Sequence, residues 1–232
     1  MAYIQIRYEC RAPAEVSPMT LDEVYETTLE QTAWIDAQGF PVTVNFSEHH
    51  GSEDGYLPSA ITMAAAAAAI TRHVRLQVNV LLPYRDPLQL AEEVVVLDRI
   101  SRGRVELLLM GGFVPSEMET FGVDPKRRGE LMEEGVRVLR QAWSGEPFEY
   151  RGRRCRILPR PVQQPHPPLF MGAASPAAAR RAARIGDGFI AVSSLNEHYL
   201  AECAAVGRTP RHQGAMPFSY PYVCKDPDRT WE

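Results

Sequence analysis

Several features that identify common protein classes are scarce or missing in this chain of 232 residues. Its four cysteines are far apart, with no Cys-x-x-Cys pair and no metal-ligand spacing, so we expect reduced thiols and no metal site: Cys10, Cys155, Cys203 and Cys224. The longest apolar run, at 63–70, is mostly alanine and far short of the ~20 residues that cross a bilayer. The chain also opens without a basic and then apolar leader. These absences predict a cytoplasmic protein that does not enter a membrane.

An excess of positive charge is missing as well. The 25 Lys and Arg residues are outnumbered by 29 Asp and Glu residues, and the net charge of -4 argues against a nucleic acid partner. The one basic stretch, at 151–160, has no interleaved aromatic residues and is typical of a solvated hairpin. Apolar residues make up 45% and charged residues 23% of the chain, an ordinary globular balance. We therefore expect residues 1–232 to form a single domain with a sizeable core.

Strand-like and helix-like segments alternate along the chain. We expect strands at 3–8, 40–46, 74–82, 105–110, 169–171, 189–192 and 218–223. The intervening segments have helical spacing or capping residues, at 20–38, 58–71, 86–100, 126–143, 176–185 and 196–206. Only the proline-rich segment at 145–168 breaks this order, and it is typical of a hairpin excursion. Such alternation predicts a parallel sheet with right-handed crossovers.

Two architectures fit this alternation, a closed (β/α)8 TIM barrel and an open doubly wound sheet. No Gly-x-Gly-x-x-Gly follows the first expected strand, which weakens the dinucleotide-binding version of the open sheet. We therefore favour an α/β barrel. A barrel of about 250 residues needs eight strands, whereas we expect about seven, and the residues at 226–231 look like the start of a helix. The expectation is a chain cut short, a further tail, or a barrel left open on one side.

The triplet Glu48-His49-His50 lies at the carboxyl end of the second expected strand. In parallel α/β folds, binding and catalytic groups collect at that end of the sheet. A carboxylate beside an imidazole can fix its tautomer and raise its basicity, which favours proton transfer near neutral pH. The alternative is a polar loop in which the histidines hydrogen-bond to the backbone. A metal site is less favoured, because no second His or Cys cluster completes a ligand set.

Two glycine-containing turns could approach a phosphate closely. The turn Gly172-Ala173-Ala174-Ser175 joins an expected strand to a helix, where small residues expose backbone N–H groups and the helix N-terminus. Gly111-Gly112 follows the fourth expected strand and allows a similar approach. Taken alone, either turn could equally be a tight connection that binds nothing.

The pieces together resemble the bacterial luciferase-like flavin monooxygenase family, over nearly the whole chain and in the right order. The motifs that carry the resemblance are Glu48-His49-His50, Pro83 to Pro87 with Leu90-Ala91-Glu92, Leu97-Asp98 with Ile100-Ser101 and Gly103-Arg104, Glu117 with Phe121-Gly122, Arg128 with Glu133 or Glu134, Trp143-Ser144-Gly145, Pro159 to Val162, Pro167-Pro168, Gly172 to Ser175, and Ala182-Ala183 with Gly186-Asp187-Gly188. Each motif is weak alone, but their succession is specific. The resemblance implies a (β/α)8 barrel that uses a reduced flavin or a deazaflavin.

The resemblance also implies roles for particular residues. The active-site histidine of the family falls on His49, with Glu48 beside it as its orienting carboxylate. A kinked, often cis, non-prolyl peptide that supports the flavin ring would fall near Val78-Asn79. The phosphate end of the cofactor would meet the two turns, with one further contact after the sixth strand: Met110, Gly111, Gly112, Gly172, Ala173, Ala174, Ser175 and Ser193.

Two departures from the family bear on the cofactor. Members that bind FMN often have an arginine in the loop after the fourth strand, where this chain has Gly111, and the turn at 172–175 has no acidic residue. Both leave room for a deazaflavin. The leading hypothesis is a monooxygenase that uses dioxygen and reduced FMN, delivered by a separate reductase, on a small organic substrate.

Two other functions remain open. The first keeps the fold and changes the chemistry to hydride transfer with a deazaflavin coenzyme. The second is a truncated flavin-binding protein without turnover, and a metal-dependent barrel hydrolase is a more distant possibility. The resemblance further implies a homodimer, with the alanine-rich helix at 58–71 as a candidate contact.

Overall fold

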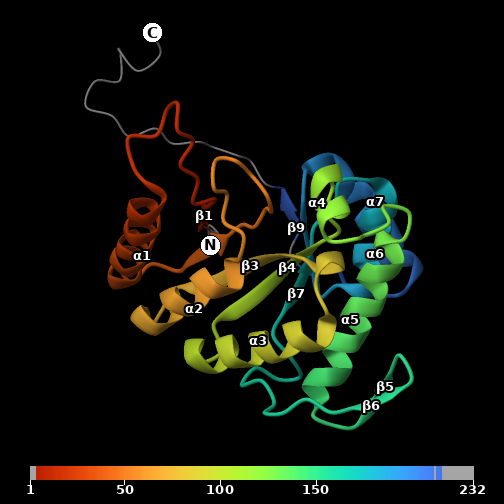
Figure 1. Cartoon of the computed structure of the whole chain (residues 1–232). Helices are drawn as coiled ribbons and strands as arrows, with labels where there is room; N and C mark the ends of the chain where they lie inside the picture. The colour runs from red at the N-terminus through yellow and green to blue at the C-terminus, as the bar shows by residue number, and fades with distance from the viewer. Residues whose placement is uncertain (1–3, 212, 216–232) are drawn as a thin grey trace.

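The computed structural model describes residues 4–211 and 213–215, and its centre is a parallel sheet of seven strands (Figure 1). Each strand pairs with its neighbours in chain order, and every pairing is parallel. The strands are β1 (Ile4–Tyr8), β2 (Val42–Phe46), β3 (Arg75–Leu81), β4 (Val105–Met110), β7 (Leu169–Met171), β8 (Gly188–Ala191) and β9 (Gln213–Ala215). Within the described residues, β1 and β9 are the two edges, so the curled sheet is a half-barrel that is open between them.

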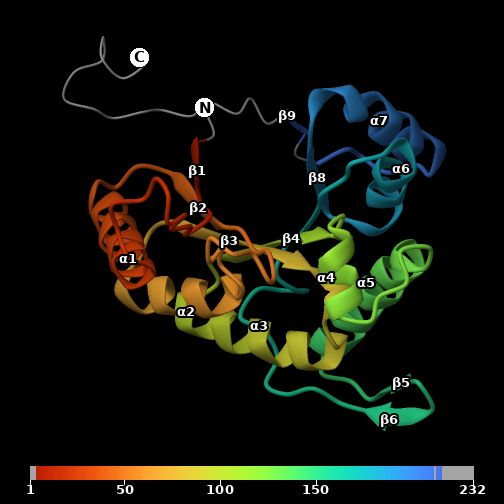
Figure 2. The same ribbon diagram turned by 45° about the horizontal axis from the view of Figure 1, so that its top comes forward.

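Helices fill the connections between the strands and lie around the outside of the curved sheet (Figure 2). They are α1 (Leu21–Ala37), α2 (Ala60–Ile70), α3 (Pro87–Ser101), α4 (Pro115–Thr120), α5 (Arg128–Ser144), α6 (Pro176–Ile185) and α7 (Asn196–Ala205), with short 3-10 turns η1 (Leu82–Tyr84) and η2 (Ser193–Leu195). The segment between α5 and β7 contains an antiparallel hairpin, β5 (Phe148–Tyr150) and β6 (Arg153–Cys155). The predicted barrel-type alternation and the hairpin excursion are confirmed.

Several helix starts are set by capping residues that the sequence indicates. Thr20 precedes α1, where its hydroxyl accepts a bond from the Glu23 amide and its own amide donates to the Glu23 carboxylate. Asp86 accepts from the backbone N–H of Leu88 at 2.8 Å at the start of α3. The helix expected from residue 58 begins at Ala60, so Pro58 precedes α2 and does not lie in its first turn.

Two elements differ from the sequence-based expectation. The short helix α4 was not expected, because six residues are too few to show a helical repeat. The last described strand is β9, at 213–215, whereas we expected a strand at 218–223. That expected strand, the helix start near 226 and Cys224 lie outside the described residues.

The two faces of the sheet differ in chemistry because side chains alternate along each strand. On the outer face, Val44, Val78 and Leu107 are buried in the main core together with helix residues. On the concave face of β2 and β3, polar side chains bond to one another: Asn45 Nδ2 donates to Asn79 Oδ1 at 2.7 Å and to Gln77 Oε1 at 2.8 Å. The concave face therefore presents polar groups in its first half.

The second half of the concave face is apolar. Leu108 of β4, Phe170 of β7 and Ile190 of β8 form a separate buried cluster, against which Met110 packs. The interior of the half-barrel thus offers a polar wall on one side and an apolar wall on the other.

Asp36, near the end of α1, fastens this helix to the turn that leads into β3. Its carboxylate accepts bonds from the backbone N–H groups of Arg72, His73 and Val74 at 2.8, 2.6 and 2.8 Å. Burial acts to raise the pKa of Asp36, but these three bonds outweigh burial and hold the pKa below its ordinary value. The folded state therefore favours the ionised carboxylate.

We predict that Asp36→Asn lowers the free energy of unfolding at pH 7 by about 2–3 kcal/mol, since hydrogen bonds to a charged group contribute about 1.5–3 kcal/mol. Because the native pKa is lowered, this contribution is complete above about pH 5 and is lost as the pH falls through the native pKa. Urea unfolding of both proteins at a series of pH values measures the difference.

Asp22→Asn is the matched control, because Asp22 is exposed in the first turn of the same helix. It should change the unfolding free energy by less than about 1 kcal/mol. A difference between wild type and Asp36→Asn that stays constant down to pH 2 would contradict the prediction.

Candidate active site at the carboxyl ends of the strands

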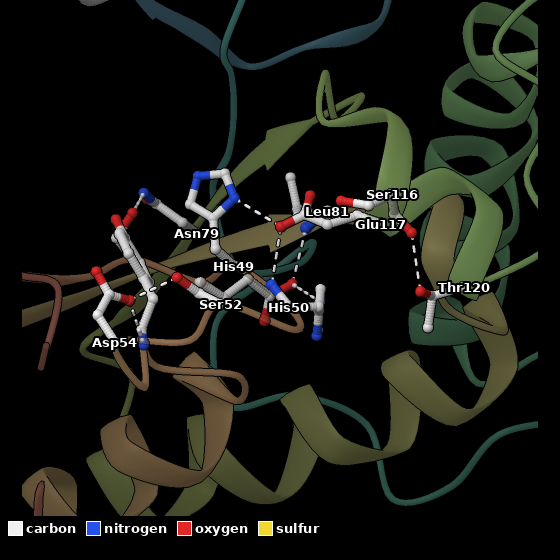
Figure 3. Close-up of polar contacts among 12 residues, drawn as sticks. His49, His50, Ser52, Asp54, Asn79, Leu81, Ser116, Glu117 and Thr120 are labelled. Atoms are coloured by element: carbon white, nitrogen blue, oxygen red, sulfur yellow. Dashed lines mark hydrogen bonds and ion pairs between the residues drawn. The ribbon is translucent and has the colours of Figure 1, made fainter. Parts of the chain in front are cut away.

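His49 lies directly beyond β2, where the chain leaves the sheet, and its imidazole is held in place by a carboxylate from a distant segment. Nδ1 of His49 lies 2.7 Å from Oε1 of Glu117 (Figure 3). The rings of Tyr56 and Phe113 contact the imidazole edge to face, with centroids at 4.8 and 5.6 Å. With Nδ1 engaged, Nε2 is the ring nitrogen left for a ligand.

Glu117 is the residue that fixes this arrangement, and its role was missed in the sequence. It lies in α4, in the connection that follows β4, and its side chain is only 2% exposed. The same oxygen, Oε1, also accepts the backbone N–H of His50 at 2.8 Å. A buried carboxylate thereby joins the loop after β2 to the loop after β4. In the sequence, this role is indicated only by the position of Glu117, an acidic residue a short distance beyond the carboxyl end of the buried strand at 105–110.

The structure does not place the Glu48 carboxylate against the His49 imidazole, where the resemblance implied it. The Glu48 carboxylate is fully buried, accepts the backbone N–H of Leu81 at 2.9 Å and pairs with Nη2 of Arg85 at 3.1 Å. Neighbouring residues in an extended segment point to opposite sides, so Glu48 and His49 diverge. Glu117 makes the contact with His49 that was expected of Glu48.

The imidazole of His50 lies among aromatic rings. Its ring centroid is 4.6 Å from that of Phe121 and 5.9 Å from that of Tyr84, and its Nε2 is 3.9 Å from a Glu48 oxygen. Burial lowers the pKa of His50, and this effect outweighs the opposing charges of Glu48 and Glu117. The imidazole of His50 is therefore neutral at pH 7.

The pair Val78-Asn79 was expected to carry a kinked peptide and contact the cofactor. β3 is instead regular here, with Val78 and Asn79 paired in register with β4, and the cis peptides among the described residues precede only Pro159 and Pro165. Val78 belongs to the outer core, so its side chain does not reach the concave face. Asn79 does reach it, and donates to Ser47 Oγ at 2.9 Å.

The glycine turn after β4 is tightly built. Gly112 has a left-handed φ of +71°, and a Cβ placed on it would overlap the hydroxyl of Tyr84. The carbonyl oxygen of Gly112 accepts a bond of 2.9 Å from Nη1 of Arg128, at the start of α5. A guanidinium therefore lies against the Gly111-Gly112 loop, although neither loop residue is an arginine.

The turn after β7 lies close to the end of β4. The backbone N–H of Gly172 donates to Leu109 O at 2.9 Å, and a Cβ on Gly172 would come within 2.7 Å of Met110 Cγ. The structure thus brings together two of the predicted cofactor segments, at 110–112 and 172–175. Ser175 caps α6 by accepting the Ala178 amide at 3.3 Å.

The remaining predicted positions vary in their exposure. Ala173 packs against the main core, whereas Ala174 is exposed. Ser193 is exposed at the start of η2, directly after β8, and its side chain forms no hydrogen bond with another described residue. Ser193 therefore shares a sheet edge with the other positions without contacting them.

Among residues 4–211 and 213–215, no three His, Cys, Asp or Glu side chains come together in a way that could hold a metal ion. The helices within these ranges include none with the length and apolar character needed to cross a membrane.

The fold and the site define a class of protein: a parallel α/β half-barrel with an imidazole and a carboxylate paired at the carboxyl ends of the strands, where barrel enzymes keep their active sites. The family model described as luciferase-like monooxygenase matches residues 7–232. The chain belongs to this family, as the succession of motifs predicts.

Three comparisons illustrate the similarity. The oxygenase component of flavin-dependent trigonelline monooxygenase from Acinetobacter baylyi is 28% identical over 68% of this chain and 45% of its own length. The crystal structure of monooxygenase RslO1 from Streptomyces bottropensis is 32% identical, with a TM-score of 0.77 over 90% of this chain and 68% of that one. An F420-dependent secondary alcohol dehydrogenase shares the fold at 19% identity, with a TM-score of 0.72 over 90% of this chain and 66% of that one. The chain spans about half the length of the curated relatives it matches.

We predict that Gly112→Ala is more destabilising than Gly51→Ala. Both glycines have a left-handed φ, at +71° and +65°, so both variants strain the backbone, but only at Gly112 does the new methyl group meet a side chain, that of Tyr84. The extra cost should be about 1–3 kcal/mol, as for other overpacked sites. Urea unfolding measures it, and equal unfolding free energies would contradict the contact.

Proposed function

We propose that this chain holds the active site of a monooxygenase that uses reduced FMN and dioxygen to oxidise a small organic substrate. The observation that carries the proposal is the His49–Glu117 pair beyond the carboxyl ends of β2 and β4. It is supported by membership of the luciferase-like family and by relatives whose names state monooxygenase activity.

The residues at the sheet edge fit the groups of FMN. A phosphate needs positive charge and N–H donors, and Arg128 together with the N-terminus of α6 at Ser175 would supply them beside the turns at 110–112 and 172–175. An isoalloxazine ring has a polar and an apolar side, which match the polar wall around Asn79 and the apolar wall around Phe170.

The protein residues would divide the work around this cofactor. A bound reduced flavin supplies the electrons that activate dioxygen. His49 gives or accepts a proton at Nε2, while Glu117 holds its ring and stabilises the charge that develops there. Tyr56 and Phe113, which flank His49, would exclude water from the reacting atoms.

Cofactor binding and turnover should respond to different residues. We predict that Arg128→Gln weakens FMN binding at least about tenfold, since a hydrogen bond to a charged group contributes about 1.5–3 kcal/mol. His49→Ala should bind FMN like wild type and lose turnover by a factor of about 100 or more. Titration of flavin absorbance and fluorescence gives the binding, and oxygen consumption with reduced FMN gives the turnover.

Arg137→Gln is the matched control, because Arg137 is on the same helix and bonds to Gln141 on the surface. It should change neither quantity. Unchanged turnover in His49→Ala would remove His49 from the mechanism, and a chain that leaves the flavin spectrum unchanged would overturn the proposal.

Hydride transfer with a deazaflavin is the second candidate. It is favoured by Gly111, at a position where FMN-binding members of the family often have arginine, and by the F420-dependent dehydrogenase with the same fold. Reduction of the oxidised deazaflavin by an alcohol, without oxygen uptake, would identify this chemistry. Binding of either cofactor without turnover would identify a non-catalytic flavin-binding protein.

The proposal includes partners and a place in the cell. The designation of the trigonelline enzyme as an oxygenase component supports a separate flavin reductase, and the dispersed cysteines suggest the cytoplasm. We also expect a homodimer. A groove between α2 and α3 is lined by Ile61, Ala65 and Val96, and Val96 is 55% exposed. Apolar side chains of this kind favour contact with another copy of the groove.

We predict that Val96→Asp converts a dimer to a monomer, because it places a charge in the apolar centre of that contact. Val206→Asp should keep the dimer, since Val206 is comparably exposed after α7, away from the groove. Sedimentation of the three proteins measures their mass. A monomeric wild type, or a dimer that Val96→Asp leaves intact, would contradict the proposed contact.

A further inference from the structure

The end of α3 and the segment that follows the β5–β6 hairpin form one exposed surface, at the amino end of β4. Oδ2 of Asp98 accepts the backbone N–H of Val162 at 2.6 Å, and Nη2 of Arg99 donates to the carbonyl oxygen of Arg160 at 2.6 Å. These bonds fasten the segment to the helix. The exposed side chains of this surface, which we name the arginine–aliphatic patch, are those of Arg99, Ile100, Arg102, Leu158, Arg160 and Val162.

The patch combines exposed aliphatic side chains with arginines that are not neutralised. Ile100, Leu158 and Val162 are 42%, 54% and 49% exposed. Arg99 and Arg160 donate to uncharged oxygens, and within the part of the chain that the structure describes none of the three arginines forms an ion pair. Arginine is enriched at protein interfaces, where apolar side chains form the buried centre. The patch therefore favours a partner that is negatively charged and presents an apolar side chain.

The outer face of α1 has these properties. α1 contains no Lys or Arg, and its exposed residues Glu26, Glu30 and Trp34 follow one another at a spacing of four, which places them along one side of the helix. Neither glutamate forms an ion pair with another described residue. Trp34 is 66% exposed, and Phe40, just beyond the helix, is 64% exposed. This face thus presents two free carboxylates next to a large aromatic side chain.

The two surfaces are separated within one copy of the chain. α1 packs against α2, and α2 packs against α3, so α2 lies between the helices that carry them (Figure 2). Asp36 turns toward the residues that follow α2, where it accepts the Arg72 amide, whereas Trp34 is about 200° away around the same helix. A second copy can bring its α1 to the patch.

We propose that the arginine–aliphatic patch of one copy binds the outer face of α1 of a second copy. Trp34 packs against the aliphatic side chains, while Glu26 and Glu30 face the arginines. Because each copy carries both surfaces, the contact is heterologous and builds a ring or a row of copies. The inference goes beyond the proposed function, since neither surface includes His49 or the turns at 110–112 and 172–175. It is also separate from the groove between α2 and α3.

Opposite charges at exposed positions make the contact sensitive to salt. The Debye length is about 30 Å at about 10 mM salt and about 8 Å at 0.15 M. We therefore expect association that is clear at the lower salt concentration and at least about tenfold weaker at the higher one. The carboxyl ends of the strands stay open in such an assembly, because the patch lies at the opposite end of the sheet.

Sedimentation velocity of the full chain measures the contact. All proteins in this test carry Val96→Asp, so that the groove between α2 and α3 does not contribute. At low salt this parent should associate as its concentration rises. Adding Glu30→Arg should weaken the association at least about tenfold, because like charges then face each other across the contact. Arg102→Glu should have the same effect from the other side.

A mixture of the two charge variants separates the contact from a loss of folding. In an equimolar mixture of Glu30→Arg and Arg102→Glu, neighbouring copies again present opposite charges, so the mixture should associate like the parent. Glu197→Arg and Arg180→Glu are the matched controls, because both residues are exposed but belong to α7 and α6. Each control alone should associate like the parent.

Trp34→Ala tests the apolar part of the contact, and it should weaken association about thirtyfold, as expected for a central aromatic residue. A parent that stays monomeric at both salt concentrations would overturn the proposal; this result is expected if another segment of the chain or an unrelated acidic protein covers the patch. Association of either charge variant at the strength of the parent would also overturn it, as would a mixture that fails to recover. Since no flavin is present, these outcomes are independent of the proposed monooxygenase activity.

Discussion

The bond from Glu117 to His49 is the interaction on which the site depends. A carboxylate with 2% exposure needs hydrogen-bond donors around it, and Oε1 receives them from His49 Nδ1 and the His50 amide, whereas Oε2 has no hydrogen-bond partner among the described residues. The two partners and Glu117 come from connections after β2 and β4, with β3 between them. One buried carboxylate therefore sets the separation of these connections as well as the orientation of the imidazole, so the geometry of the His49–Glu117 pair and the packing of the loops cannot vary independently.

The division of the concave face follows from the same strands. Asn45 and Asn79 bond to each other, so the polar wall is rigid without a ligand. Leu108 and Phe170 form the facing wall by packing, which allows small adjustments. A planar ring bound between the two walls would be oriented by hydrogen bonds to the polar wall. The apolar wall would accommodate small shifts in the position of the ring. The loops beyond the carboxyl ends of the strands add a further surface to these two walls, where Phe113 is exposed.

Much of this architecture is readable from the sequence, and its limits are physical. The ends of the first six strands of the main sheet could be placed because strands appear as apolar or alternating runs between helices, and this put His49 beyond the carboxyl end of β2. The partner of His49 could not be deduced, because the contact joins residues 68 apart and depends on the side to which each residue turns. The same alternation separates Glu48 from His49 and Val78 from Asn79, so each pair contributes only one side chain to the concave face. β9, with three residues, is too short for any strand pattern.

The order of the sheet has a consequence for how the protein is made. Since the seven strands of the main sheet follow one another in the sheet as they do in the chain, each new strand can add to an edge that already exists when it leaves the ribosome. Each parallel pairing nevertheless spans an intervening helix, so it can form only after that helix has been synthesised. The loop with His49 is the first to wait for a distant partner, because its partner Glu117 is synthesised two strands later. Until Glu117 has been synthesised, the His49 imidazole and the His50 amide lack the carboxylate that holds them in the finished fold.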